Sequence, residues 1–181
     1  QLKDILDNQQ PFSCMVFCNT KAKVDHLHEK LKIGRYKCAS LHGGMAQKYR
    51  LEAINDFKQG QVQILVATDL AARGIHVDQL DLVVNFNVPN EEEFYIHRIG
   101  RTGRAGHSGQ AITFVNGQDK RKWVDVQKFI NYEVPKFKQT KVAKSLEQNT
   151  DDLIKVEPSK FKAKKITKKH KDITRLRINV G

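Results

Sequence analysis

The sequence predicts an α/β domain in which a mainly parallel sheet lies between two layers of helices. Short apolar runs of β-type composition alternate along the chain with stretches of helical periodicity. One of these runs, Ile64–Ala67 (ILVA), has no polar position, as in a strand buried on both faces of a parallel sheet. Alternation of this kind builds right-handed β–α–β units, and these place helices on both faces of the sheet.

Five segments have the composition of strands. They are Ser13–Asn19, Lys37–His42, Gln61–Thr68, Leu80–Val88 and Gln110–Val115. Pro89 ends the fourth, because proline has no N–H to donate to a neighbouring strand.

Four segments between these strands predict helices. They are Lys21–Leu31, Ala46–Gln59, Glu91–Ile99 and Gln118–Tyr132. Thr20 is a suitable N-cap for the first of them. The helical spacing predicts two inward faces, Leu51, Ile54 and Phe57 in the second helix and Trp123, Val126 and Ile130 in the last.

The composition is that of one globular domain followed by a tail. The chain has 181 residues, of which 39% are hydrophobic and 29% charged. Residues 1–140 are predicted to form the domain and residues 141–171 a basic linker, while residues 172–181 are strand-like again. No apolar run approaches the roughly 18–20 residues of a membrane helix, and no signal peptide is recognisable. We expect a cytoplasmic protein whose three cysteines, Cys14, Cys18 and Cys38, are reduced.

Most of the positive charge belongs to the tail. The net charge of the chain is +12, and the 24 residues from Pro158 to Gly181 contribute +8 through nine Lys or Arg and one Asp. A basic tail favours an anionic partner. Nucleic acid is the first candidate and an anionic membrane surface the second.

Polar clusters follow several of the predicted strands. They are Asn19–Thr20, His42–Arg50, Thr68–Gly74 and, after a predicted helix, His97–Arg104. Ligands of parallel sheets bind beyond the carboxyl ends of the strands. We therefore expect these clusters to lie near one another and to form the functional site.

Three arginines, Arg98, Arg101 and Arg104, lie at three-residue spacing in a stretch without Asp or Glu. Like charges at this spacing repel on a helix or turn, and an anion between them relieves the repulsion. The planar fork of arginine matches phosphate oxygens. The alternative is that the three are ordinary solvated surface arginines.

The string from His97 to Arg104, HRIGRTGR, resembles motif VI of the DEAD-box RNA helicases, residue for residue. The resemblance implies a RecA-like fold and an enzyme that hydrolyses ATP. It implies that Arg101 and Arg104 are arginine fingers for the γ-phosphate of ATP held by another lobe. It also implies that His97 couples the ATP site to RNA, and that Arg98 organises the loop.

The string from Ile64 to Val77, ILVATDLAARGIHV, resembles motif V of the same family. The resemblance places Thr68 and Gly74 at the RNA backbone with Arg73 close by, and makes Asp69 a residue that orients the arginines of motif VI.

The chain departs from this motif at His76, where the family usually has an Asp that contacts the ATP ribose. A neutral imidazole has one acceptor nitrogen and no negative charge, so we expect weaker ribose recognition at His76.

Two further segments resemble family elements that contact RNA phosphates. The resemblance of CMVFCNT, residues 14–20, to motif IV places Thr20 at a phosphate. In LHGGMAQKYR, residues 41–50, Gly43 permits close approach of the backbone, and Gln47 with Arg50 can share one phosphate in the first turn of a helix. RNA is therefore the expected partner, recognised through its backbone.

The chain has no GxxxxGK[ST] sequence and no DEAD sequence. The resemblance implies that a first RecA-like lobe holds ATP and Mg²⁺, so we expect this chain alone to be inactive. The alternative is a noncatalytic RNA-binding or scaffold module. HGGM together with TRLRINVG resembles the DbpA-like branch of the family, which implies ribosomal RNA as the target and makes residues 172–181 the first strand of an RRM-like domain.

Overall fold

The computed structural model describes residues 1–75, 77, 79–103 and 109–136, and the backbone of residues 152–156. The strands are β1 (Cys14–Phe17), β2 (Cys38–Leu41), β3 (Ile64–Ala67), β4 (Leu82–Asn85), β5 (Gln110–Val115) and β6 (Asp152–Val156). The helices are α1 (Leu2–Gln9), α2 (Lys21–Ile33), α3 (Gln47–Lys58), α4 (Asp69–Ala72), α5 (Glu92–Ile99) and α6 (Lys120–Ile130), with a 3-10 turn, η1 (Gly117–Asp119), before α6. None of the described helices is long and apolar enough to cross a membrane.

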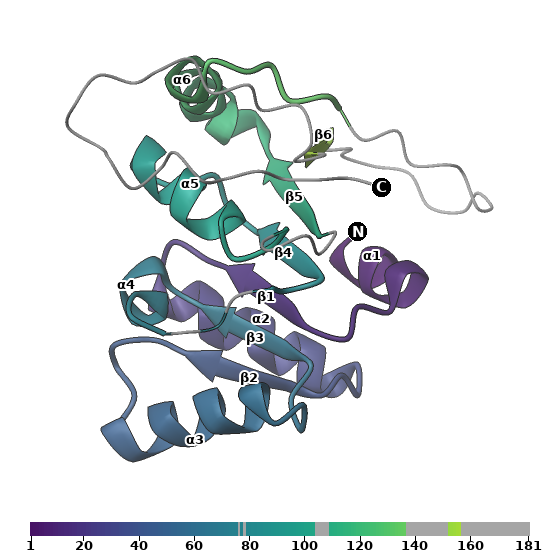
Figure 1. Ribbon diagram of the computed structural model, residues 1–181, viewed down its shortest axis with the longest axis vertical. Helices are drawn as coiled ribbons and strands as arrows, with labels where there is room; N and C mark the ends of the chain where they lie inside the picture. The colour runs from purple at the N-terminus through teal and green to yellow at the C-terminus, as the bar shows by residue number, and fades with distance from the viewer. Residues whose placement is uncertain (76, 78, 104–108, 137–151, 157–181) are drawn as a thin grey trace.

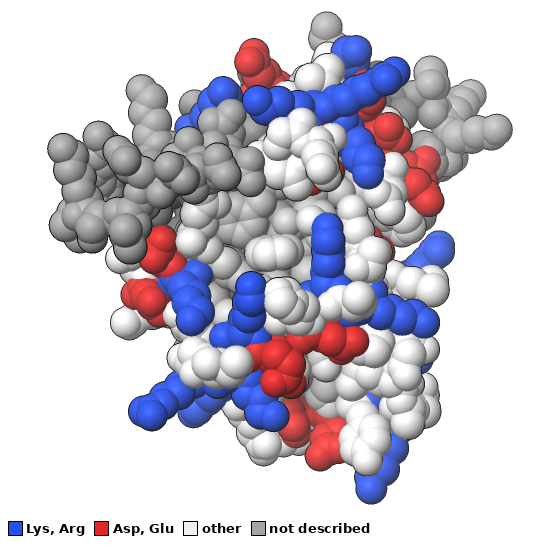
Figure 2. Space-filling model, turned by 180° about the vertical axis from the view of Figure 1, so that it is seen from behind, with Lys and Arg blue, Asp and Glu red and all other residues white. Residues whose placement is uncertain are grey.

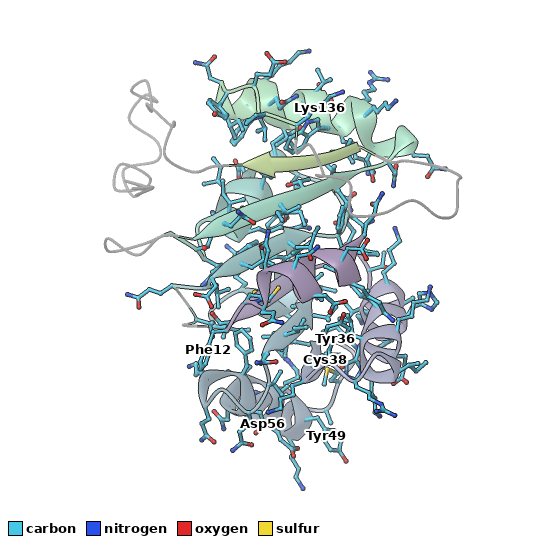
Figure 3. The ribbon with its side chains drawn as sticks, turned by 90° about the vertical axis from the view of Figure 1, so that its right-hand side faces the viewer. Phe12, Tyr36, Cys38, Tyr49, Asp56 and Lys136 are labelled. Atoms are coloured by element: carbon cyan, nitrogen blue, oxygen red, sulfur yellow. The ribbon has the colours of Figure 1, made fainter. Side chains whose placement is uncertain are left out.

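The strands form one sheet in the order β2-β3-β1-β4-β5-β6. The first five are parallel, as predicted from the alternation of strands and helices, and β6 runs antiparallel to β5. Figure 1 shows this order from β2, beside α3, to β6 near α6. Figure 3 shows the same two ends from the side, with Tyr49 and Asp56 of α3 far from Lys136.

Two separate hydrophobic cores confirm the predicted three layers. Because successive side chains of a strand point to opposite faces, Cys14 and Val16 of β1 lie in one core and Met15 and Phe17 in the other. The first core is completed by α1 and α2, and the second by α3 to α6. All four β1 residues are at most 2% exposed, which explains why this run has no polar position.

The register brings the carboxyl ends of β1, β2, β3 and β4 to one level. Phe17 of β1 pairs with Ala67 of β3 and with Asn85 of β4. Leu41 of β2 is level with Ala67, and Thr113 of β5 is level with Asn85. The residues that follow β1, β2, β3 and β4 therefore leave the same edge of the sheet.

Two details differ from the sequence prediction. Leu51 was predicted to face inward, but 51% of it is exposed, because the side of α3 that meets the sheet carries Ala53, Ile54 and Phe57. The other difference is β6, which lies inside the predicted linker of residues 141–171. Its short sequence, DLIKV, is flanked by charged residues and carries little β-type periodicity.

The cysteines fit their predicted role as thiols of the interior. Cys14 and Cys18 are fully buried and Cys38 half-buried, and none forms a disulfide. Burial, the largest cause, raises the pKa of the Cys18 thiol to about 12, and it raises the pKa of Cys14 and Cys38 as well. These thiols are protonated at neutral pH and are poor nucleophiles.

Gly109 occupies a position where the backbone leaves no room for a side chain. A Cβ atom there would overlap Thr102 Oγ1 and would lie 2.6 Å from the backbone nitrogen of Gly103. Thr102 is itself fixed, since its hydroxyl donates a hydrogen bond to the carbonyl of Leu80 and the two residues form a β-bridge. The loop after α5 is therefore attached to the sheet at this point.

Replacing Gly109 with alanine is expected to destabilise the domain by about 2–3 kcal/mol, because the methyl group overlaps backbone atoms that cannot rotate away. Urea denaturation of the purified chain measures this. Gly117→Ala is the matched control, since a Cβ on Gly117 meets no atom within 4 Å and its stability should be unchanged. Equal stability of both variants would show that the approach at Gly109 is not tight.

Candidate functional site

The centre of the site is the buried side chain of Arg98, which is only 1% exposed. Its Nε and Nη2 groups donate to the two carboxylate oxygens of Asp69, over 2.6 and 2.7 Å. Asp69 is the first residue of α4 and Arg98 lies in the last turn of α5. This pair therefore connects the two helices that follow β3 and β4.

The remaining N–H groups of Arg98 also have hydrogen-bond acceptors. Nη2 donates to Asn19 Oδ1 over 2.9 Å, and Nη1 donates to Asn85 Oδ1 over 3.2 Å and to the carbonyl of Asn87 over 2.8 Å. The guanidinium also lies 5.2 Å from the centre of the Phe17 ring. All five guanidinium N–H groups thus have an acceptor, which is the arrangement that a buried arginine needs.

Asn19 and Asn85 extend this network. Asn19 Nδ2 donates to the carbonyl of Val88 over 2.8 Å, and Asn85 Nδ2 donates to Thr113 Oγ1 over 3.0 Å. The network therefore reaches β1, β4 and β5 at the edge where the strands end. The sequence prediction assigned no role to the asparagines of β4 and its end, although Asn85 and Asn87 are the only polar residues of the stretch Leu82–Val88.

Asp69 was expected to orient the arginines of motif VI. The structure pairs it with Arg98, the first of the three, and Arg98 was expected to organise the loop. Arg98 consequently has no N–H left for a ligand. Arg101 is partly exposed, and its Nη1 donates to the carbonyl of Ile75 over 2.9 Å.

A cleft of ≈ 240 Å³ lies beside this network. Side chains from β1, α4, α5 and the residues just after the two helices surround it, namely Phe17, Asp69, Ala72, Arg73, Phe94, His97, Arg98 and Arg101. His97 is exposed and its ring meets that of Phe94 edge to face, with centroids 6.3 Å apart. The cleft thus brings Asp69, Arg73, His97 and Arg101 together, four of the residues singled out from the sequence.

Two predicted site residues, His76 and Arg104, lie outside the residues that the structure describes. Gly74 has a φ of +79°, a backbone conformation in which glycine is the favoured residue. Ile75, the next residue, supplies the carbonyl that holds Arg101. The motif V turn therefore contributes to the position of Arg101.

A second group of residues expected at RNA phosphates follows β1, β2 and β3, which are neighbours in the sheet. Thr20 is exposed, and its hydroxyl caps α2 by accepting the N–H of Lys23 over 3.3 Å, as predicted. Thr68 follows β3 and is half-buried. Because Thr68 N–H donates to the carbonyl of Leu41 over 3.1 Å, the chain after β3 is attached to the end of β2.

Gln47 and Arg50 share the first turn of α3. Arg50 Nη1 donates to Gln47 Oε1 over 3.4 Å, while its Nε is buried without a hydrogen-bond partner among the described residues. Gly43 is exposed in the loop before α3. The two side chains are neighbours, so they can act on the same anion.

The surface charge does not by itself mark the site. Figure 2 shows a band of Lys and Arg side chains along the end of the molecule where α6 lies, and basic and acidic side chains intermixed over the rest of that face. The clusters at the strand ends are therefore identified by their local geometry rather than by the overall charge.

Replacing Arg98 with lysine keeps the charge but leaves several of the five acceptors without a donor, because an ammonium group has three N–H bonds and cannot span a carboxylate and two amides. We expect a loss of about 3 kcal/mol in the free energy of unfolding, measured with urea. Arg121→Lys on the exposed surface of α6 is the control and should change nothing. An Arg98→Lys chain as stable as the unaltered one would refute the proposed dependence on this network.

One family model and several curated relatives match the sequence of this chain. The family model described as "Helicase conserved C-terminal domain" matches residues 1–106. The chain is 40% identical over 181 residues to the ATP-dependent RNA helicase DbpA of Bacillus subtilis, covering 99% of this chain and 38% of that protein. It is 44% identical over 133 residues to eukaryotic initiation factor 4A of Dictyostelium discoideum, covering 74% of this chain and 33% of that protein. The chain thus spans about a third to two fifths of the length of the curated relatives that it matches.

Solved structures give the same result. The DEAD-box protein of Methanococcus jannaschii superposes with a TM-score of 0.68 at 38% identity, over 73% of this chain and 36% of that one. The Escherichia coli DEAD-box protein SrmB, solved with the regulator of ribonuclease activity A, also gives 0.68, at 37% identity over 72% of this chain and 77% of that one. These matches confirm the predicted RecA-like α/β fold. The chain therefore belongs to the DEAD-box helicases, as a C-terminal domain of that family.

Proposed function

We propose that this chain is the second lobe of an ATP-dependent RNA helicase, in which it supplies arginine fingers for ATP hydrolysis and backbone contacts for RNA. The observation that carries the proposal is that Arg98 and Arg101, three residues apart, differ in burial and hydrogen bonding. Both line the cleft together with His97 and Arg73, but Arg98 is buried with every N–H group occupied, whereas Arg101 is partly exposed. The network holds Arg98 rigidly and thereby positions the loop that carries Arg101. Such positioning is required of a residue that contacts a phosphate in a defined geometry.

In this proposal the ATP phosphates and Mg²⁺ are held by the first lobe, and Arg101 approaches the γ-phosphate when the lobes close. Its guanidinium is then a preorganised positive group, which stabilises the charge that develops on the transferred phosphoryl group. Arg104 is proposed as the second finger, from its place in HRIGRTGR. His97 is proposed to couple this site to RNA, since it lines the same cleft. His76 is proposed as the ribose contact.

The RNA side of the proposal rests on the second group of residues. Thr20, Gly43 and Thr68 follow β1, β2 and β3, which are neighbours in the sheet. Gln47 and Arg50 lie next to them in the first turn of α3. Contacts of these types bind phosphates and carry no sequence information, which is the requirement for a helicase that acts on many duplexes.

The proposal extends to ribosomal RNA as the target. The similarity to Bacillus subtilis DbpA covers 99% of the chain, whereas that to the initiation factor covers 74%. The basic tail is therefore included in the first match. A tail with a charge of +8 adds backbone affinity for RNA, and this affinity falls steeply with salt.

Arg101→Ala is expected to reduce RNA-stimulated ATP turnover of the two-lobed helicase by at least about 10³-fold, because the mutant lacks the charge that stabilises the transition state. Arg101→Lys should be nearly as slow, since a lysine lacks the planar fork. Steady-state phosphate release measures kcat. RNA affinity in the presence of a nonhydrolysable ATP analogue should stay within about twofold, and Arg121→Ala should behave as the unaltered enzyme. Turnover of Arg101→Ala within tenfold of normal would contradict the finger.

Arg50→Ala is expected to weaken binding of single-stranded RNA to the chain by about fivefold at low salt, equally for all sequences, because one phosphate contact is lost. The slope of log affinity against log salt should fall by about 0.7 for that one contact. Fluorescence anisotropy at several salt concentrations measures both quantities. Lys58→Ala, at the exposed far end of the same helix, removes the same charge and should leave the slope unchanged. Identical slopes for all three proteins would exclude Arg50 from the RNA site.

A further inference from the structure

Two polar side chains, Asn85 of β4 and Thr113 of β5, lie inside a hydrophobic core beside the site. They occupy paired positions on neighbouring strands, and each is 0% exposed. They share a face of the sheet with Val83 and Ala111, because residues two apart in a strand point the same way. The helix that carries Arg98, α5, packs beside these strands (Figure 1). The pair is therefore buried between the sheet and α5.

The side-chain amide of Asn85 makes two hydrogen bonds of opposite direction. Its oxygen accepts an Nη1–H of Arg98 over 3.2 Å, and its nitrogen donates to Thr113 Oγ1 over 3.0 Å. A guanidinium group has only donors, so it requires the oxygen of the amide. The amide nitrogen is also a donor, and it needs an acceptor on the other side. Thr113 supplies this acceptor and thereby determines which end of the amide faces Arg98.

Tyr95 carries a second buried hydroxyl in this core, one turn before Arg98 in α5. Its ring meets that of Trp123 edge to face, with centroids 5.5 Å apart. Burial raises the pKa of the Tyr95 phenol, and the Thr113 hydroxyl acts in the opposite direction. No hydrogen bond of normal geometry joins the Tyr95 hydroxyl to another described residue. This hydroxyl therefore lies outside the chain of hydrogen bonds from Thr113 to Arg98.

Without the Thr113 hydroxyl, the amide of Asn85 could not satisfy both of its ends. Its NH₂ group would be buried without an acceptor, which is unfavourable in an apolar core. Rotation of the amide would turn this group toward Arg98, and two donors would then face each other. In either case the hydrogen bond between Asn85 and Arg98 is weakened or lost.

The position of Arg98 affects Arg101 directly. The backbone N–H of Arg101 donates to the carbonyl of Arg98 over 3.2 Å. Both side chains line the same cleft, with Arg98 buried and Arg101 partly exposed. A shift of Arg98 is therefore passed to the backbone from which Arg101 extends.

We infer that Thr113 is a positioning residue for ATP hydrolysis. Its hydroxyl orients Asn85, and Asn85 in turn holds Arg98 in the place that supports Arg101. The inference rests on the proposed role of Arg101 as an arginine finger, and it adds a residue of β5 that lies outside the four segments resembling family motifs. Because a finger acts on the transition state, a displaced Arg101 lowers kcat and leaves the KM for ATP nearly unchanged.

The experiment measures RNA-stimulated ATP turnover of the two-lobed helicase at a temperature well below its melting transition. Thr113→Val replaces the hydroxyl with a methyl group of similar size and should lower kcat about tenfold, with the KM for ATP within about twofold of normal. Thr113→Ser keeps the hydroxyl and should restore kcat to within about twofold of normal. Equal losses in the valine and serine variants would refute a role for the hydroxyl.

Two control substitutions separate positioning from stability and from the loss of a buried hydroxyl in general. Ile112→Val shortens the preceding residue of β5, which lies in the other core, and destabilises the domain without touching Asn85. Tyr95→Phe removes a buried hydroxyl that makes no hydrogen bond of normal geometry. Both should keep kcat within about twofold of normal. A fall of about tenfold in either variant would overturn the inference.

A double substitution tests whether Thr113 acts through Asn85. Asn85→Leu alone should lower kcat at least about tenfold, because Arg98 loses the same acceptor. Adding Thr113→Val to that variant should have no further effect, since the hydrogen bond it removes is already absent. A further fall of about tenfold, the result for independent sites, would contradict this path.

The outcomes distinguish this inference from the function on which it rests. If Arg101→Ala slows turnover but Thr113→Val does not, Thr113 has no positioning role and the proposed function stands. If Arg101→Ala keeps turnover within about tenfold of normal, both are overturned.

Discussion

The interaction on which the rest of this structure depends is the burial of the Arg98 guanidinium at the edge of the sheet. A buried charge is tolerated only when its hydrogen bonds are satisfied, and here the five N–H groups meet acceptors from Asp69, Asn19, Asn85 and Asn87. These acceptors belong to three different segments that end at one level. The arginine consequently fixes the relative positions of the turns that carry the site.

This network explains why Arg98 is buried while Arg101 is partly exposed. Arg98 lies in the last turn of α5, on the side that faces the sheet. Arg101 follows the end of the helix at Gly100 and is held by the carbonyl of Ile75, while Thr102 is bridged to Leu80. The loop is therefore held by hydrogen bonds on both sides of Arg101. As a result, the side chain of Arg101 has a defined position beside the cleft.

The proposed RNA residues are supported differently, by contacts between consecutive strand ends. Thr68 N–H is bonded to the carbonyl of Leu41, and His42, the next residue, links α2 to the loop before α3. The two groups of residues are connected through β3, because Thr68 and Asp69 are adjacent in the chain. In the proposed function, ligand binding at the cleft and RNA binding at the second group would therefore act on the same short segment.

The sequence by itself determined the parallel sheet and the family. Apolar runs such as ILVA have few alternatives to a buried strand, and HRIGRTGR is specific enough to indicate the family. Only the tertiary structure decided that Arg98 is buried while Arg101 is partly exposed, and that Asn85 and His42 form hydrogen bonds between segments. It also decided that Leu51 is exposed and that β6 is added to the sheet. The physical reason is that hydrophobic periodicity reports burial along one element, whereas hydrogen-bond partners and the facing side of a helix depend on residues that are distant in the sequence and meet only when the sheet is assembled.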